Sequence, residues 1–394
     1  MGVKESFIIH QGQTTPFPLC IDVASAEGVY ITDKSGKTYL DLVAGVSACS
    51  IGHCHPRVVK AIQDQSSKYM HVMVYGEFIQ EPQLGLAKKL ASLLPDTLNS
   101  TFFVNSGTEA IEASIKLAKR YTGRTEIISC KNSYHGSTHG PLSIMGKETY
   151  KQKFRPLLPD CRQIIYNDED SLKEITEKTA AVIIEPIQGA TGFITPKNGY
   201  LKLVREKCDE VGALLIFDEI QTCFGRTGNL FAFETFDVIP DILCMAKGMG
   251  GGMPIGSFTT STEKMHSLRE NPMLGHITTF GGHPIVCAAS LATLDELCET
   301  QLFREVEKKE TLFRALLHHP KIKEIRGKGL ILAIELDDVE LCQKVVKRGI
   351  EKGIITFFFL FSKTAVRLSP PLTISDDEIR YAANIILNIL CNGL

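Results

Sequence analysis

The middle of the chain alternates short apolar runs with amphipathic segments of helical length, and this alternation restricts the fold more than any other feature. The apolar runs lie at residues 101–104, 126–130, 180–184, 213–217 and 242–246. The amphipathic segments lie at residues 106–121, 171–178, 200–211 and 284–299. Buried strands that alternate with helices are typical of a parallel sheet flanked by helices. We therefore predict an α/β fold built around one mainly parallel sheet.

The chain changes character after about residue 302. Helical patterns and strand-like runs follow one another there, at residues 303–317, 321–325, 330–336, 339–352 and 378–390. Residues 375–378 read Ser-Asp-Asp-Glu, which is a capping box at the start of the last helix. Near the other end of the chain, residues 28–42 have the pattern of a hairpin with its turn at residues 33–36.

These patterns predict two domains. Residues 51–293 form a large α/β domain, and the two chain ends, 1–50 and 294–394, together form a small α+β domain.

Charge and cysteine usage exclude several classes of partner. Lys and Arg number 43 against 45 Asp and Glu, a net charge of −2, so no excess charge points to nucleic acid or an anionic membrane. The most apolar stretch, at residues 353–361, is about half as long as the ~20 residues of a membrane helix. The N-terminus has no apolar signal core, and the twelve cysteines form no CxxC pair. We expect a cytoplasmic protein without nucleic-acid, membrane or metal partners.

Two adjacent carboxylates follow the apolar run at 213–217. Because neighbouring residues of a strand point to opposite faces, Asp218 and Glu219 cannot share one task. Ligands of open α/β sheets bind at the carboxyl ends of the strands, so one of the two is a candidate site residue. The alternative is that both are solvated loop acids.

A lysine and a glycine-rich turn follow the apolar run at 242–246. Lys247 ends this run and precedes Gly248-Met-Gly-Gly-Gly252. A lysine that is desolvated there would be nucleophilic as the free amine, whereas most lysines are exposed. The turn lacks the third glycine of a dinucleotide fingerprint and the ending of a P-loop, so it predicts neither NAD nor ATP.

Three other segments carry candidate site residues. Ser106, Gly107 and Thr108 begin a helix after a strand, which suits a phosphate, although capping alone explains Ser106 with Glu109.

Tyr134, followed by His135, comes after the strand at 126–130 and can either stack on a flat ring or pack in the core. Arg367 lies in an apolar strand and needs a carboxylate or phosphate from a substrate or from the protein itself. His53, Cys54 and His55 are too crowded to close around one Zn²⁺.

Together these residues describe a site for pyridoxal phosphate with an amino acid attached. The order of the motifs then resembles class III (omega-amino-acid) aminotransferases of pyridoxal-phosphate fold type I, near the acetylornithine and ornithine aminotransferases. The resemblance covers nearly the whole chain, through NSGTEA at 105–110, EPIQG at 185–189, DEIQT at 218–222, FGRTG at 224–228, AKG at 246–248, TFGG at 279–282 and RLSPP at 367–371.

The resemblance implies a role for each matching residue. Lys247 would hold pyridoxal phosphate as a Schiff base and move the proton in catalysis, and Asp218 would keep the pyridine nitrogen protonated. Gln221 would bind the ring phenolate oxygen and Tyr134 would stack on the ring. Ser106, Gly107 and Thr108, at the start of the helix, would hold the phosphate. His135 would belong to the same cofactor site.

The resemblance also implies a homodimer with shared active sites, because Thr279 would reach the partner's phosphate. Arg367 would bind a substrate carboxylate, and Glu185 would lie near the substrate and pair with an arginine to switch between substrates. The reaction would move an amino group from an omega-amino or diamino acid to an oxo acid, with 2-oxoglutarate expected. An aminomutase, a decarboxylase or a non-catalytic relative are the alternatives. The chain departs from many relatives at Ser137 and Ala190, which lie near the ring or the substrate.

Overall fold

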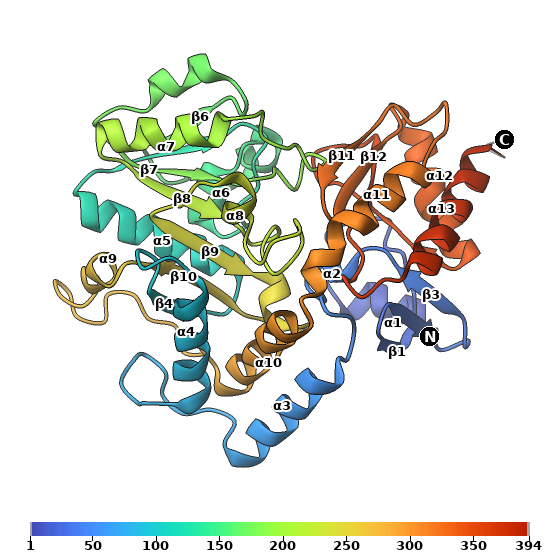
Figure 1. The fold of residues 1–394 in the computed structure, drawn as a ribbon, viewed down its shortest axis with the longest axis horizontal. Coiled ribbons are helices and arrows are strands. Elements are labelled where there is room, and N and C mark those ends of the chain that lie inside the picture. The colour runs from blue at the N-terminus through green and yellow to red at the C-terminus, as the bar shows by residue number, and fades with distance from the viewer. Residues whose placement is uncertain (1, 392–394) are drawn as a thin grey trace.

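The computed structural model describes residues 2–391 and contains one large sheet and two small ones (Figure 1). The seven strands of the large sheet lie in the order β4 (Ser100–Val104), β10 (Gly256–Thr260), β9 (Ile242–Ala246), β8 (Leu214–Asp218), β7 (Thr179–Ile184), β5 (Glu126–Cys130) and β6 (Cys161–Ile164). Only β10 runs antiparallel to its neighbours. The predicted mainly parallel α/β fold is therefore confirmed.

The five strands expected in this sheet are all present, and β6 and β10 are additional. Neither additional strand has an apolar run, because β6 reads Cys-Arg-Gln-Ile and β10 reads Gly-Ser-Phe-Thr-Thr. Strands β7, β8 and β9 are buried on both faces by helices. The helices of this part of the chain are α3 (Pro56–Lys68), α4 (Glu81–Leu93), α5 (Gly107–Thr122), α6 (His139–Ile144), α7 (Tyr200–Val211), α8 (Ala232–Phe236), α9 (Thr262–His266) and α10 (Pro284–Thr300).

The prediction of an α-helix at residues 171–178 is wrong. A 3-10 helix, Glu169–Glu174, occupies this segment after Asp168 accepts a hydrogen bond from Asp170 N. The backbone is already extended at Ile175, and β7 begins at Thr179, so the helix ends before residue 178.

The two chain ends form the smaller sheets, as Figure 1 shows by the blue and red elements that lie together. The first sheet has the order β1 (Val23–Glu27), β2 (Tyr30–Asp33), β3 (Thr38–Asp41) and β13 (Ile354–Ile355), and β13 pairs with β3 in parallel. The predicted hairpin is thus confirmed and pairs with the C-terminal part. The second sheet has the order β11 (Glu324–Lys328), β12 (Ile331–Glu335), β15 (Ala365–Leu368) and β14 (Phe357–Phe358).

Helices cover these sheets largely as expected: α11 (Val306–Leu316), α12 (Val339–Lys352) and α13 (Asp376–Cys391), with α1 (Val3–His10) and the short α2 (Ala44–Ser47) near the N-terminus. The capping box of α13 forms, since Ser375 Oγ accepts from Glu378 N and Glu378 Oε2 accepts from Ser375 N. The run expected at 321–325 becomes strand only from Glu324, because a turn from His319 to Ile322 precedes it. The domain limits at 51 and 293 stay a prediction.

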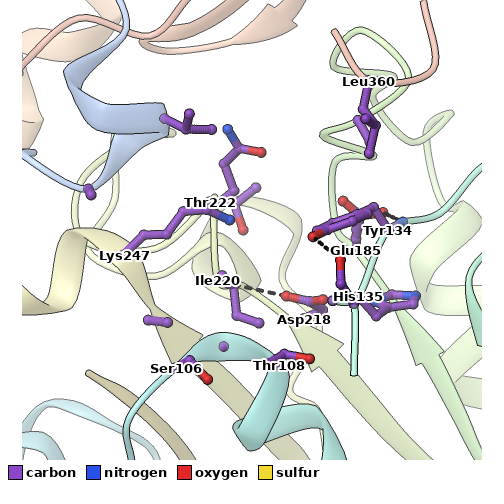
Figure 2. Close-up of a pocket in the computed structure, with 18 of the residues that line it drawn as sticks. Ser106, Thr108, Tyr134, His135, Glu185, Asp218, Ile220, Thr222, Lys247 and Leu360 are labelled. Atoms are coloured by element: carbon purple, nitrogen blue, oxygen red, sulfur yellow. Dashed lines mark hydrogen bonds and ion pairs between the residues drawn. The ribbon is translucent and has the colours of Figure 1, made fainter. Parts of the chain in front are cut away.

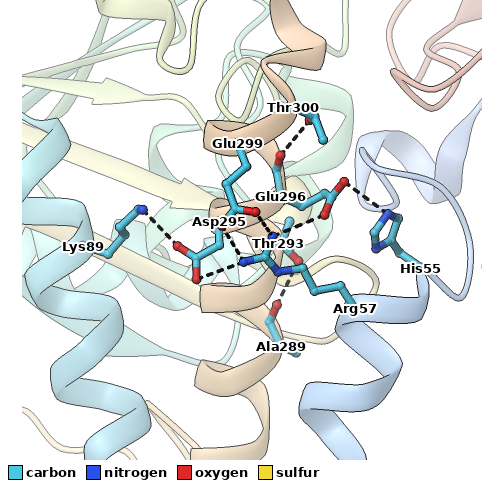
Figure 3. Close-up of polar contacts among 9 residues, drawn as sticks. All are labelled: His55, Arg57, Lys89, Ala289, Thr293, Asp295, Glu296, Glu299 and Thr300. Atoms are coloured by element: carbon cyan, nitrogen blue, oxygen red, sulfur yellow. Dashed lines mark hydrogen bonds and ion pairs between the residues drawn. The ribbon is translucent and has the colours of Figure 1, made fainter.

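A network of ion pairs joins α3 and α4 to α10 (Figure 3). Arg57 of α3 forms a bidentate pair with Glu299, at 2.6 and 2.8 Å, and its guanidinium also faces Asp295 and Glu296. Lys89 of α4 pairs with Asp295 at 2.9 Å. Asp295 of α10 thus pairs with a side chain from each of the other two helices, Arg57 of α3 and Lys89 of α4.

We expect Arg57→Ala to lower the free energy of unfolding by about 1 kcal/mol, because the variant leaves three acidic side chains facing one another. Lys60→Ala is the matched control on the same helix, since Lys60 pairs with the exposed Asp64 of α3 and, within residues 2–391, with no other acid. Thermal unfolding followed by circular dichroism should show a lower midpoint for Arg57→Ala than for Lys60→Ala, and the difference should shrink at high salt. Equal midpoints would show that the network adds no stability.

Candidate active site

A cavity of about 1080 Å³ lies at the carboxyl ends of the parallel strands. Its lining comes from the end of β8 at Asp218, the residue after β9 at Lys247, the start of α5, and Arg367 of β15 in the small sheet. In Figure 2, Lys247, Asp218 and Thr108 project towards one space, and Leu360 closes it from the opposite side. Residues far apart in the sequence therefore meet in one cavity.

Asp218 is buried and held on both carboxylate oxygens. Oδ2 lies 2.7 Å from Nδ1 of His135, and Oδ1 accepts a hydrogen bond of 3.1 Å from Ile220 N. Desolvation by burial lowers the pKa of His135, but the hydrogen bond and the charge of Asp218 outweigh it, so that the pKa is raised. His135 is thus a partner of the carboxylate and not a free base.

Glu219 points to the opposite face of the sheet, as the alternation of a strand requires. Its carboxylate accepts hydrogen bonds from the first amides of α8, at 2.5 Å from Ala232 N and 2.6 Å from Phe233 N. Burial raises its pKa to about 8. The expectation that Asp218 and Glu219 point to opposite faces is confirmed, and the alternative of two solvated loop acids is wrong, because both are buried.

Lys247 begins a short 3-10 helix, Lys247–Gly250, directly after β9, and its backbone has φ of +47°. Its side chain is half-buried in the cavity. Burial lowers the pKa of the Lys247 amine, and the charges of Asp218 and Glu185 offset part of this effect. The amine is therefore easier to deprotonate than that of an exposed lysine.

The start of α5 combines a capped helix with a close backbone approach. Ser106 Oγ accepts from Glu109 N at 3.4 Å, while the side chain of Glu109 returns to Asn105 N at 2.7 Å, one residue before the expected position. A Cβ atom on Gly107 would lie 2.7 Å from the side chain of Ile220, so only glycine fits without a shift. Thr108 Oγ1 lies 2.7 Å from Thr138 Oγ1. Capping and an anion site are thus both compatible with this helix end.

Arg367 is buried, with 5% of its surface exposed, and it lines the cavity. Among residues 2–391 its Nε and Nη1 have no hydrogen-bond partner and its guanidinium has no ion pair; it lies 4.4 Å from the ring centre of Phe359 and 5.2 Å from that of Phe193. Burial lowers its pKa to about 10. The alternative of an internal ion pair is therefore wrong.

Glu185, which follows β7, is also buried beside the cavity. Its two carboxylate oxygens accept hydrogen bonds from Tyr134 N at 2.9 Å and Gly189 N at 2.8 Å. Burial raises its pKa, in part offset by His135. The expected pair with an arginine is not present in the described residues, because backbone amides of two loops already hold this carboxylate.

The remaining predicted residues are divided between the cavity and the surface. Tyr134 and Gln221 line the cavity. The hydroxyl of Tyr134 lies 3.1 Å from Ser137 Oγ, and Gln221 Nε2 donates to Ser47 Oγ at 3.4 Å. Thr279 is exposed and does not line the cavity of its own chain.

Four apolar residues of the C-terminal part line the cavity and were not predicted as site residues: Phe357, Phe358, Phe359 and Leu360. Their signal in the sequence is the apolar run at 353–361, which is too short for a membrane helix. The structure has no helix in residues 2–391 that is long and apolar enough to cross a membrane. In the same range, no group of three His, Cys, Asp or Glu side chains is arranged to hold a metal ion.

The fold and the cavity together define a fold type I transferase of the pyridoxal-phosphate type. A family model described as aminotransferase class-III matches residues 11–390. The chain therefore belongs to the class III aminotransferases and is a transaminase.

Individual relatives agree. The chain is 39% identical to the acetylornithine aminotransferase of Methanopyrus kandleri, covering 95% of this chain and 94% of the relative. It is 41% identical to that of Clostridium acetobutylicum, covering 91% and 93%. A crystal structure of ornithine aminotransferase from Toxoplasma gondii, with partial occupancy of pyridoxal phosphate, superposes with a TM-score of 0.92 at 31% identity and covers 99% of this chain and 93% of its own.

The cofactor of this family, pyridoxal phosphate, fits the residues present. Three features around one cavity match the three parts of the cofactor. The buried carboxylate of Asp218 suits the ring nitrogen, and the easily deprotonated amine of Lys247 suits the aldehyde. The helix start at Gly107, where only glycine fits, suits the phosphate.

The lowered pKa of Lys247 makes a prediction for cofactor binding. Only the free amine attacks an aldehyde, so apoprotein should take up pyridoxal phosphate covalently at a pH where an ordinary lysine is still protonated. The rate of uptake is measured as a function of pH by the visible absorption of the bound cofactor. The pH of half-maximal rate should be lower for the apoprotein than for N-acetyl-lysine amide under the same conditions. A midpoint at or above that of the free amine would contradict the prediction.

Proposed function

We propose that this aminotransferase takes the amino group from the terminal amine of an omega-amino or diamino acid, of the acetylornithine, ornithine or 4-aminobutyrate type, and delivers it to an oxo acid, with 2-oxoglutarate as the expected acceptor. The observation that carries the proposal is the Arg367 guanidinium, which forms no ion pair within residues 2–391 and lies in the same cavity as Lys247 and Asp218. A buried guanidinium without an ion pair favours a substrate carboxylate as its partner. The names of the relatives support this donor class.

Pyridoxal phosphate, when bound, supplies the electron sink that makes a hydrogen on the amino-bearing carbon acidic. Lys247 would hold the cofactor and later move this proton with its Nζ. Asp218 would bind the protonated ring nitrogen, and its orientation is set by His135 and Ile220 N. A carboxylate that is pinned on both oxygens needs no rearrangement to do this, which is the advantage of a preorganised site.

The other predicted residues would position the cofactor and the substrate. The start of α5, with Ser106, Gly107 and Thr108, would bind the phosphate through amides and hydroxyls. Tyr134 would cover one face of the ring, and Gln221 would donate to the phenolate oxygen. Arg367 would bind a substrate carboxylate, and the apolar residues at 357–360 would keep water away from the reacting carbon.

Glu185 would lie beside the substrate without binding it as an anion. Burial raises the pKa of the Glu185 carboxyl. Because this carboxylate binds the amides of Tyr134 and Gly189, it would fix the conformation of the two loops that contain them. The departures from relatives at Ser137 and Ala190 lie in this same region of the cavity, so they bear on which donor fits.

We further propose a homodimer with shared active sites. Two segments contact each other, since the ring centres of His71 and His283 stack at 5.4 Å. Both segments expose large apolar side chains: Met70, Phe78, Ile79, Met273, Leu274 and Phe280. An exposed apolar surface of this kind indicates a subunit interface. Thr279 lies on this surface, so in a dimer it would reach the partner's cavity.

We also propose that residues 51–293 form the large domain, that residues 1–50 and 294–394 form the small one, and that the protein is cytoplasmic. All twelve cysteines are free, which suits a reducing compartment.

The proposal is tested with a panel of amino donors. Ornithine, acetylornithine, lysine and 4-aminobutyrate, each with 2-oxoglutarate or pyruvate, should give turnover with at least one donor, and 2-oxoglutarate should be the better acceptor. Lys247→Ala should lose activity by more than about 10³-fold and lose the visible absorption of the bound cofactor. Reaction of a donor without any oxo acid would instead support an aminomutase or decarboxylase, and no reaction at all would support a non-catalytic relative.

Shared sites predict complementation between two defective chains. In a mixed dimer of Lys247→Ala and Thr279→Ala chains, one of the two sites contains both native residues. Random reassociation should therefore restore about a quarter of wild-type activity, since half of the dimers are mixed. Recovery should follow the fraction of mixed dimers measured by native mass spectrometry. A mixture no more active than its parents, or a monomer in sedimentation, would refute shared sites.

A further inference from the structure

The guanidinium of Arg367 lies against the faces of two buried phenyl rings. Its central carbon is 4.4 Å from the ring centre of Phe359 and 5.2 Å from that of Phe193. The two rings meet edge to face, with their centres 4.9 Å apart and their planes at 86°. A cation over an aromatic face is attracted by the negative charge of that face, and the attraction is stronger where water is excluded. The two rings are therefore contacts that hold this cation.

The ring of Phe359 is fixed by the segment that carries it. Phe359 directly follows β14, and β14 pairs with β15, the strand of the arginine. On its other side, the carbonyl of Leu360 accepts a hydrogen bond of 3.0 Å from the hydroxyl of Tyr150. Phe361 N then donates to the carbonyl of Ala190 at 2.9 Å. The ring thus lies between a strand pairing and two anchors in the loops that follow α6 and β7.

The ring of Phe193 is presented by a tight loop after β7. Gln188 and Ile194 pair across this loop, with backbone hydrogen bonds of 3.0 and 3.2 Å. The carbonyl of Gly192 accepts a hydrogen bond of 2.9 Å from Arg326 Nε, and a Cβ atom on Gly192 would lie 2.6 Å from Nη2 of the same arginine. Phe193 itself has φ of +53°, a left-handed conformation that costs energy for residues other than glycine. The loop therefore keeps a strained backbone that places the ring on Arg367.

In the part of the chain that the structure describes, no acid takes the place of these rings. Arg367 forms no ion pair there, and Glu185 is already held by two backbone amides. An acidic partner would occupy donors of the guanidinium, whereas a ring face leaves them free. Nε and Nη1 of Arg367 have no hydrogen-bond partner among residues 2–391, and Arg367 and Phe359 both line the cavity. The rings thus hold the cation while its donors stay open to a ligand.

We propose that Phe359 and Phe193 are positioning residues that hold the Arg367 guanidinium in the cavity, ready for a substrate carboxylate. This inference rests on the proposed role of Arg367 in binding that carboxylate. An arginine side chain that is already ordered loses less conformational entropy when its ligand arrives. The rings therefore raise the affinity for the carboxylate through Arg367.

The test is the binding of glutarate to the holoenzyme, measured by isothermal titration calorimetry. Glutarate has two carboxylates and neither an amino nor an oxo group, so it binds without reacting. Phe359→Leu keeps an apolar side chain but removes the ring face, and it should raise the dissociation constant of glutarate about tenfold. Phe359→Tyr keeps the ring and should stay within about twofold of the wild type. An equal loss in both variants, or no loss in Phe359→Leu, would overturn the proposal.

A second variant without a ring guards against a folding defect, with thermal unfolding as the check on each protein. Phe359→Met is suitable because methionine fills irregular gaps in a core. It should bind glutarate as weakly as Phe359→Leu does, since neither side chain has an aromatic face. Wild-type affinity in Phe359→Met would show that the ring is not needed and would overturn the proposal.

A double-mutant cycle separates an effect through Arg367 from a change in the shape of the cavity. Arg367→Ala should weaken glutarate binding at least about thirtyfold, because it removes a charge-assisted pair. In this background Phe359→Leu should have no further effect. A loss of the same size as in the presence of Arg367 would show that Phe359 acts on the ligand directly, which contradicts a positioning role.

Failure of the inference differs from failure of the proposed function. Wild-type affinity for glutarate in Arg367→Ala, or no binding to the wild type, would refute the proposed carboxylate site and the inference with it. Weak binding in Arg367→Ala together with wild-type affinity in Phe359→Leu would refute only the positioning by the rings.

Discussion

The parallel alignment of β7, β8 and β9 is the constraint on which the site depends. The strands pair in register, with Ile184 opposite Phe217 and Asp218 opposite Cys244, so the residues that follow them emerge at one edge. Glu185, Asp218 and Lys247 are brought to one cavity in this way although no two of them are near in sequence. The buried apolar strands provide the rigidity, since a shift of one residue in β8 would exchange the positions of Asp218 and Glu219.

The two neighbouring carboxylates at the end of β8 serve stability and chemistry separately. Glu219 binds the start of α8 and supports the fold, while Asp218 is held by His135 beside the cavity. Both carboxylates are buried, and each is compensated by hydrogen bonds rather than by an ion pair with lysine or arginine. Within the part of the chain that the structure describes, Arg367 and Lys247 therefore form no ion pair and remain available to a ligand.

Much of the fold could be predicted because burial leaves a periodic signal. The helices α7 and α12 were predicted to the residue, and β5, β8 and β9 to within one. Strands β6 and β10 were missed because a short or polar strand that pairs with an existing sheet needs no apolar run of its own. The prediction of an α-helix at residues 171–178 is wrong because hydrophobic periodicity does not distinguish a short 3-10 helix, here Glu169–Glu174, from an α-helix.

The sequence by itself determined most of the elements, the cofactor class and the candidate residues Lys247, Asp218 and Arg367, because periodicity, motif order and strand ends carry that information. Only the tertiary structure decided their surroundings. Asp218 pairs with His135, and two backbone amides hold Glu185. Among residues 2–391 Arg367 meets no carboxylate, and Thr279 lies on the surface of its own chain. Desolvation and hydrogen bonding depend on contacts between segments distant in sequence, and these exist only once the sheets have formed.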